Sequence, residues 1–271
     1  MIIGTSDSVR MIVDEECAME TKRKMTLEVC VESVESALAA VEGGADRLEL
    51  CADLIIGGTT PSPALFRAIR RRTDIPMHVM IRPRFGDFCY TESELEIMKD
   101  QIEEFRNLGA EGIVLGILKS DGSLDTEKMA ELLACAGGMK ITLHRCFDMC
   151  RDPEKTLEEA VKLGVSIILT SGQKDRCVDG TELLRELQQK AAGRIIIQAG
   201  SGVEAGIIRE VYEKTGICAY HMSGSKVYDS RMTYRKEGVS MGLPGFSEYE
   251  IRSTDCGKIR EARRILDQCM K

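Results

Sequence analysis

The chain alternates between two patterns of apolar residues. Stretches with helical spacing, such as the stripe of Leu95, Met98, Ile102 and Phe105, are each followed by a short continuous apolar run. The runs are rich in Ile, Val and Leu, which is typical of parallel strands buried on both faces. Regular alternation of helix and strand therefore predicts an α/β fold with a parallel sheet.

Residues that start and end helices mark the same units. Gly44, Gly109 and Gly164 each stand between a helical stretch and an apolar run, where glycine suits the left-handed conformation that ends a helix. Thr91 and Glu94 have the spacing of a capping box, which predicts a helix beginning directly after Thr91. These signals divide the chain into repeated strand–helix units.

Eight such units follow one another along the chain. The strands are predicted near residues 25–30, 46–51, 76–82, 112–116, 140–145, 165–170, 194–199 and 218–222. Eight units in 271 residues favour a single (β/α)8 barrel, a TIM barrel, over the alternative of an open doubly wound sheet. We expect residues 25–271 to form the barrel, residues 1–24 to be an N-terminal extension, and the last helix to begin only at about residue 256. The long polar connection at residues 224–255 is of a kind often used in function or assembly.

Composition narrows the classes of function. The net charge of −7 provides no general attraction for nucleic acid or anionic lipid, and the aromatic share of 4% argues against base-stacking platforms. No apolar run approaches the roughly 20 residues that span a bilayer. The N-terminus lacks the basic start and continuous apolar stretch of a secretory signal, so we expect a cytoplasmic protein.

Polar residues gather where the predicted strands end, which is where barrel enzymes carry their active sites. Strand residues alternate between faces, so if Leu27 and Val29 pack outward, Glu28 and Cys30 face the barrel axis. The residues selected in this way are Glu28, Cys30, Glu49, Cys51, Arg82, His144, Arg145, Asp148, Ser171, Gly200, Gly202, His221 and Ser223.

Buried charges need partners. We expect Glu28 and Glu49 to face Arg82, with His144 nearby. Such a set is either a structural ion-pair network or an active site, and its position at the strand ends favours a site. His78 lies early in its strand and is expected to be a core or surface residue, whereas His144 and His221 are candidates for acid–base or ligand roles.

The eleven cysteines are odd in number and scattered along the chain. Cys146 and Cys150 have no second pair to complete a zinc site, and free thiols are normal in a reducing compartment. Cys30 and Cys51 stand at equivalent positions in neighbouring strands and could share one Cu(I), a soft ion that thiolates bind well. The alternative is that both are simply small buried residues.

Several ordered motifs between about residue 25 and residue 242 resemble the CutC family. They are Leu27-Glu28-Val29-Cys30, residues 43–51, Gly57-Gly58-Thr59-Thr60-Pro61-Ser62, Met80-Ile81-Arg82-Pro83-Arg84, Gly86-Asp87-Phe88, His144-Arg145-Cys146-Phe147-Asp148 and Leu169-Thr170-Ser171-Gly172. The resemblance implies a cytoplasmic barrel assigned to copper homeostasis, copper binding through cysteine and a homo-oligomer. The sequence departs from the family pattern at His78, where an aliphatic residue is usual, and at Cys146, where alanine is usual.

Two functions follow from these observations. The first is copper handling, with Cys30 and Cys51 as the Cu(I) ligands. The second is an enzyme acting on a small polar or phosphorylated metabolite, because the charged set combines acid–base groups with an anion anchor and barrels often hold phosphate after strands seven and eight. Its predicted catalytic residues are Glu28, Glu49, Arg82, His144, Arg145, Asp148 and His221, with Ser171, Gly200, Gly202 and Ser223 holding the ligand. A scaffold role is a third option, which the clustered charges disfavour.

Overall fold

The computed structural model describes residues 25–243 and 245–270. The predicted N-terminal extension at residues 1–24 therefore lies outside the described residues. Within the described part of the chain, no helix has both the length and the apolar character needed to cross a membrane.

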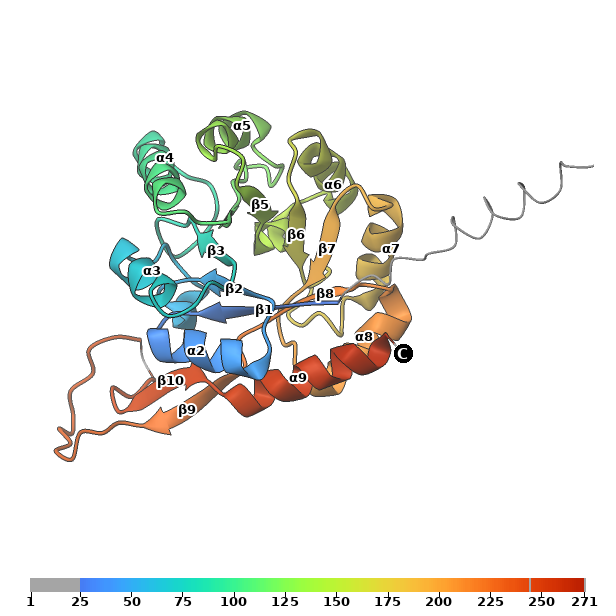
Figure 1. Cartoon of the computed structure of the whole chain (residues 1–271). Helices are drawn as coiled ribbons and strands as arrows, with labels where there is room; N and C mark the ends of the chain where they lie inside the picture. The colour runs from blue at the N-terminus through green and yellow to red at the C-terminus, as the bar shows by residue number, and fades with distance from the viewer. Residues whose placement is uncertain (1–24, 244, 271) are drawn as a thin grey trace, which may run out of the picture.

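Eight parallel strands form a closed barrel in sequence order (Figure 1). They are β1 (Thr26–Val31), β2 (Arg47–Leu50), β3 (Met77–Met80), β4 (Gly112–Leu115), β5 (Lys140–Leu143), β6 (Ile167–Thr170), β7 (Ile196–Ala199) and β8 (Ala219–Met222). Each strand pairs with the next, and β8 pairs with β1 to close the ring. The predicted TIM barrel is thus confirmed.

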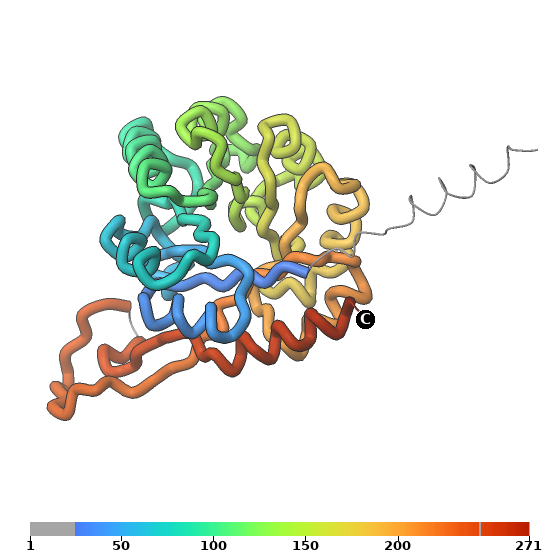
Figure 2. Tube along the Cα trace, in the orientation of Figure 1, coloured from blue at the N-terminus to red at the C-terminus, as the bar shows by residue number. Residues whose placement is uncertain are grey.

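Helices surround the barrel, as the tube in Figure 2 shows. They are α2 (Val34–Gly43), α3 (Pro63–Arg70), α4 (Glu92–Asn107), α5 (Thr126–Cys135), α6 (Pro153–Lys162), α7 (Thr181–Ala191), α8 (Ala205–Thr215) and α9 (Cys256–Cys269), with two 3-10 turns, η1 (Leu54–Ile56) and η2 (Arg145–Met149). The predicted capping box of Thr91 and Glu94 begins α4, and Gly44 ends α2 in the left-handed conformation. Local sequence therefore fixes these boundaries.

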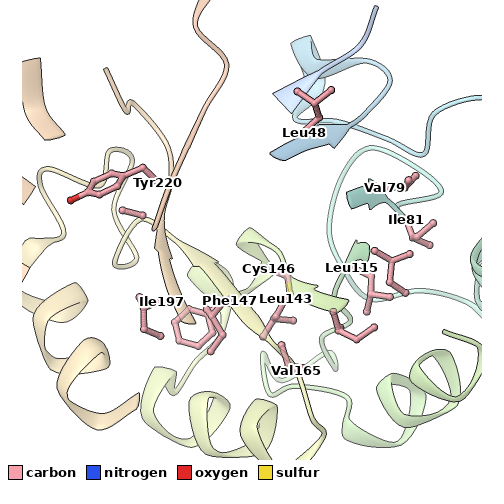
Figure 3. Packing of buried hydrophobic residues seen from close by; sticks show 14 of the residues in the cluster. Leu48, Val79, Ile81, Leu115, Leu143, Cys146, Phe147, Val165, Ile197 and Tyr220 are labelled. Atoms are coloured by element: carbon pink, nitrogen blue, oxygen red, sulfur yellow. The ribbon is translucent and has the colours of Figure 1, made fainter. Parts of the chain in front are cut away.

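The core has two layers because strand side chains alternate between the faces of the barrel wall. Outward residues pack against the helices, and Figure 3 shows members of this layer that include Leu48, Leu143 and Ile197. Leu27 and Val29 belong to the same layer, as predicted. A smaller cluster inside the barrel is formed by Cys30, Cys51, Met80 and Val114. Glu28 and Glu49 alternate with the outward residues and are also buried.

The connection before the last helix contains ordered structure that the sequence did not indicate. Strands β9 (Ser225–Asp229) and β10 (Glu250–Thr254) pair antiparallel and project beside α2 as an arm, followed by α9 (Figures 1 and 2). We call residues 225–243 and 245–254 the arm. Its exposed large apolar side chains include Tyr228, Tyr234 and Met241. The predicted homo-oligomer stays a prediction.

Candidate functional site

A cavity of about 360 Å³ opens at the carboxyl ends of the barrel strands. Most of the polar residues selected from the sequence line it. They are Cys30, Glu49, Arg82, His144, Arg145, Gly202, His221 and Ser223. The expected convergence is incomplete, because Glu28, Cys51, Asp148, Ser171 and Gly200 are not part of the lining.

Glu28 lies in the barrel interior and is 0% exposed. Its carboxylate accepts hydrogen bonds from Arg47 Nε, from Gln198 Nε2 at 2.8 Å and from His221 Nδ1 at 2.9 Å. Burial acts to raise the pKa of Glu28, but the Arg47 cation and the His221 hydrogen bond outweigh it and lower the pKa below its usual value. Glu28 is therefore an ionised carboxylate that holds His221 by one nitrogen.

The other nitrogen of His221 faces Glu49. His221 Nε2 lies 3.6 Å from Glu49 Oε2. Burial alone would lower the pKa of His221, but Glu49, the Cys30 sulfur and Glu28 raise it well above its usual value. Burial raises the pKa of Glu49, with His221 acting in the opposite direction. The two side chains thus form an electrostatically coupled acid–base pair that lines the cavity.

One group of side chains in this cavity has the geometry of a metal site. Single ligand atoms of Cys30, Glu49 and His221 lie within 4.8 Å of one another. Cys51 is not part of this group: its thiol donates to Glu49 Oε2 at 3.4 Å, and burial raises its pKa well above the usual value. The structure therefore groups Cys30 with His221 and Glu49, where the sequence suggested a pair of Cys30 and Cys51.

Arg82 does not pair with Glu28 or Glu49, so this part of the prediction was wrong. Its two terminal nitrogens donate to backbone carbonyls of Gly57, Gly58 and Gly86, at 2.8–3.2 Å. These carbonyls belong to loops whose path sequence reasoning did not anticipate. They hold the guanidinium at the cavity wall.

His144 follows β5 and is buried, at 3% exposed. Its Nδ1 accepts the backbone N–H of Cys146 at 3.2 Å. Burial, reinforced by the nearby Arg82 charge, lowers the pKa of His144 to about 3. The imidazole is therefore neutral at physiological pH and carries its hydrogen on Nε2.

Asp148 has a structural position behind the cavity. Its carboxylate accepts hydrogen bonds from Arg145 Nε at 2.8 Å, from the hydroxyl of Thr170, and from the backbone N–H groups of Ser171 and Gln173. These contacts tie the 3-10 turn after β5 to the loop after β6. Asp148 and Ser171 thus hold the loops, and Arg145 is the member of this network that reaches the cavity.

Sequence reasoning missed two interior residues, Arg47 and Gln198. Arg47 is the register partner of Glu28 on the neighbouring strand. The alternation that turned Glu49 inward also turns Arg47 inward, so the signal was present. His78 was expected in the core or at the surface, and the structure places it in the core, with Nδ1 3.3 Å from the hydroxyl of Thr142.

Comparison with known proteins gives concordant matches. The model of the CutC family matches residues 25–226. A family protein CutC from Bacteroides thetaiotaomicron is 46% identical over 88% of this chain and 96% of its own length. A copper homeostasis protein cutC homolog from Homo sapiens is 41% identical over 88% of each chain. A crystal structure of a copper homeostasis protein CutC from Streptococcus agalactiae has a TM-score of 0.71 and 32% identity, covering 73% of this chain and 98% of that one.

Proposed function

Because this chain belongs to the CutC family, we propose that it handles copper and binds one Cu(I) ion beside Cys30, His221 and Glu49. Copper is the cargo suggested by the names of the human and mouse relatives, which are called copper homeostasis proteins. Cys30 and His221 offer the thiolate and imidazole ligands that suit Cu(I). Binding the ion releases two protons, one from the Cys30 thiol and one from His221 Nε2. Glu49 beside them can accept one of these, and the other leaves to solvent through the open cavity.

The orientation of His221 is the observation that carries this proposal. Histidines that bind metals usually donate one ring N–H to a carboxylate, which leaves the other nitrogen free for the ion. Here Nδ1 is held by Glu28 at 2.9 Å, and Nε2 faces the side chains of Cys30 and Glu49. Cys30 also lines the open cavity, whereas Cys51 is 0% exposed and its raised pKa opposes thiolate formation.

A matched pair of cysteine variants tests the proposal. In an anaerobic competition titration against a Cu(I) chelator, Cys30→Ser should weaken binding by at least about tenfold, because a ligand is lost. Cys51→Ser is the control and should retain the affinity of the original chain. Equal losses of Cu(I) affinity in both variants would favour Cys30 and Cys51 as a ligand pair. Unchanged affinity in both variants would show that copper binds elsewhere.

A second function is supported by the acid–base pair itself. A buried carboxyl with a raised pKa beside a protonated imidazole, both lining an open cavity, is the arrangement of general acid–base enzymes. Glu49 and His221 would then transfer protons to and from a small molecule in the cavity. Copper loading should inhibit such an activity, because both functions use the same two side chains.

The cysteines fit the cytoplasmic location that we propose for this chain. Cys30, Cys51, Cys146, Cys150 and Cys177 are buried free thiols. Such a set is characteristic of proteins that work in a reducing compartment.

A further inference from the structure

We infer that the cavity contains a second binding site, formed by Arg82 and His144, for the carboxylate of a small organic acid. Neither residue belongs to the group proposed to bind copper. The inference therefore does not depend on the copper proposal. It rests on a buried charge and two buried hydrogen-bond donors that have no counterion and no acceptor among the described residues.

Arg82 is a buried cation that lacks an ionic partner among the described residues. It is 6% exposed, and the hydrogen bonds that it makes go to uncharged backbone carbonyls. Tyr90 lies beside the guanidinium, but burial raises the pKa of its phenol to about 12, so this neighbour is neutral as well. Burying an unpaired charge is costly, and an anion in the cavity would offset that cost.

One donor of Arg82 and one of His144 are unsatisfied within the described part of the chain. Arg82 Nε and His144 Nε2 are both buried and make no hydrogen bond there. His144 Nδ1 is occupied by the Cys146 N–H, so Nε2 carries the ring hydrogen and acts as a donor. The low pKa of His144 keeps this donor neutral, so the ligand's charge is met by Arg82 alone.

Phe88 is a common neighbour of the two residues. The Arg82 guanidinium lies 5.0 Å from the Phe88 ring centroid, and the His144 ring centroid lies 4.8 Å from it. All three residues line the same cavity of about 360 Å³, a size that suits a small metabolite. Glu49 lines it too, and its Oε1 is a buried acceptor without a partner among the described residues, which suits a ligand that also carries a hydroxyl or amino group.

The charge of the site favours a carboxylate over a phosphate. The hydrogen bonds to Gly57, Gly58 and Gly86 use three of the five N–H groups of Arg82, so Nε–H and one terminal N–H remain for a ligand. Arg82 carries one positive charge and His144 is neutral, which matches the single negative charge of a monocarboxylate better than the higher charge of phosphate.

Nitrogen NMR of the full chain tests this inference directly. The resonances of Arg82 Nε–H and His144 Nε2 are followed while acetate, glycolate or lactate is added, with lactamide and inorganic phosphate as comparison probes. We expect the resonances of both nitrogens to shift saturably with at least one carboxylate. The affinity for the uncharged lactamide should be lower by about tenfold or more, because a hydrogen bond to a charged group is lost. Absence of a saturable shift with all three carboxylates, or tighter binding of phosphate, would overturn the inference.

Two variants and a control make the test specific. Arg82→Gln and His144→Phe should each weaken carboxylate binding by about tenfold or more. If Arg82→Gln fails to fold, His144→Phe decides, since it keeps the contact with Phe88 and removes the Nε2 donor, together with the hydrogen bond from the Cys146 N–H. Arg84→Met should bind normally, because Arg84 pairs with Asp87 and Glu94 and is not part of the cavity lining. Unchanged affinity in both Arg82→Gln and His144→Phe would contradict the assignment.

Discussion

Arg47 and Glu28 are register partners on neighbouring strands and form an ion pair inside the barrel, with side chains 12% and 0% exposed. This pair neutralises the carboxylate that orients His221. The acid–base pair at the cavity therefore depends on an arginine that does not itself line the cavity.

Removing this arginine should destabilise the barrel. Arg47→Met leaves the buried Glu28 carboxylate with His221 as its remaining cationic neighbour, and we expect the free energy of unfolding to fall by about 3–5 kcal/mol because the Arg47 ion pair is lost. Urea denaturation measures the change. The double variant Arg47→Met/Glu28→Gln should recover part of the loss, because no uncompensated charge remains. A loss below about 1 kcal/mol in the single variant would show that the pair contributes little to stability.

Gly116, directly after β4, allows His144 and Cys146 to pack closely. A Cβ atom added at Gly116 would lie 2.2 Å from Cys146 Sγ and 3.0 Å from His144 Cε1. Gly116→Ala should therefore cost about 1–3 kcal/mol of unfolding free energy through overpacking. Cys146→Ala removes the nearest obstacle, so the double variant should be more stable than the sum of the two single losses predicts. If the loss of unfolding free energy in the double variant equalled the sum of the two single losses, measured by thermal or chemical denaturation, this packing argument would be contradicted.

The buried neutral His144 makes stability depend on pH. Its folded-state pKa of about 3 lies below the usual value of 6.5 in an unfolded chain. The unfolded chain thus binds more protons between these two values, and stability falls as the pH is lowered through this window. Between pH 7.5 and pH 5, His144 alone should account for a loss of about 2 kcal/mol.

The comparison that isolates this effect is His144→Gln against the original chain. Urea denaturation is followed at pH 7.5 and at pH 5 for both proteins. The variant should lose about 2 kcal/mol less over that range, because its residue 144 does not titrate. If the unfolding free energy fell by the same amount in both proteins between pH 7.5 and pH 5, His144 would not be buried in its neutral form.

The sequence by itself determined the barrel and the face on which each strand residue lies. Both properties depend on local periodicity: alternation along a strand turned Glu28, Cys30 and Glu49 inward once Leu27 and Val29 were assigned to the helix layer. Capping residues such as Thr91 and Gly44 fixed helix ends in the same local way. No long-range information was needed for these predictions.

Only the tertiary structure decided which inward residues meet. Glu28 and His221 are 193 residues apart in the chain and become neighbours because β8 closes the ring against β1. The register between β1 and β2 places Arg47 opposite Glu28. Arg82 instead donates hydrogen bonds to the loop carbonyls of Gly57, Gly58 and Gly86. Periodicity specifies the face of a strand but neither the register between distant strands nor the path of a loop, and these two features set the chemistry of the cavity.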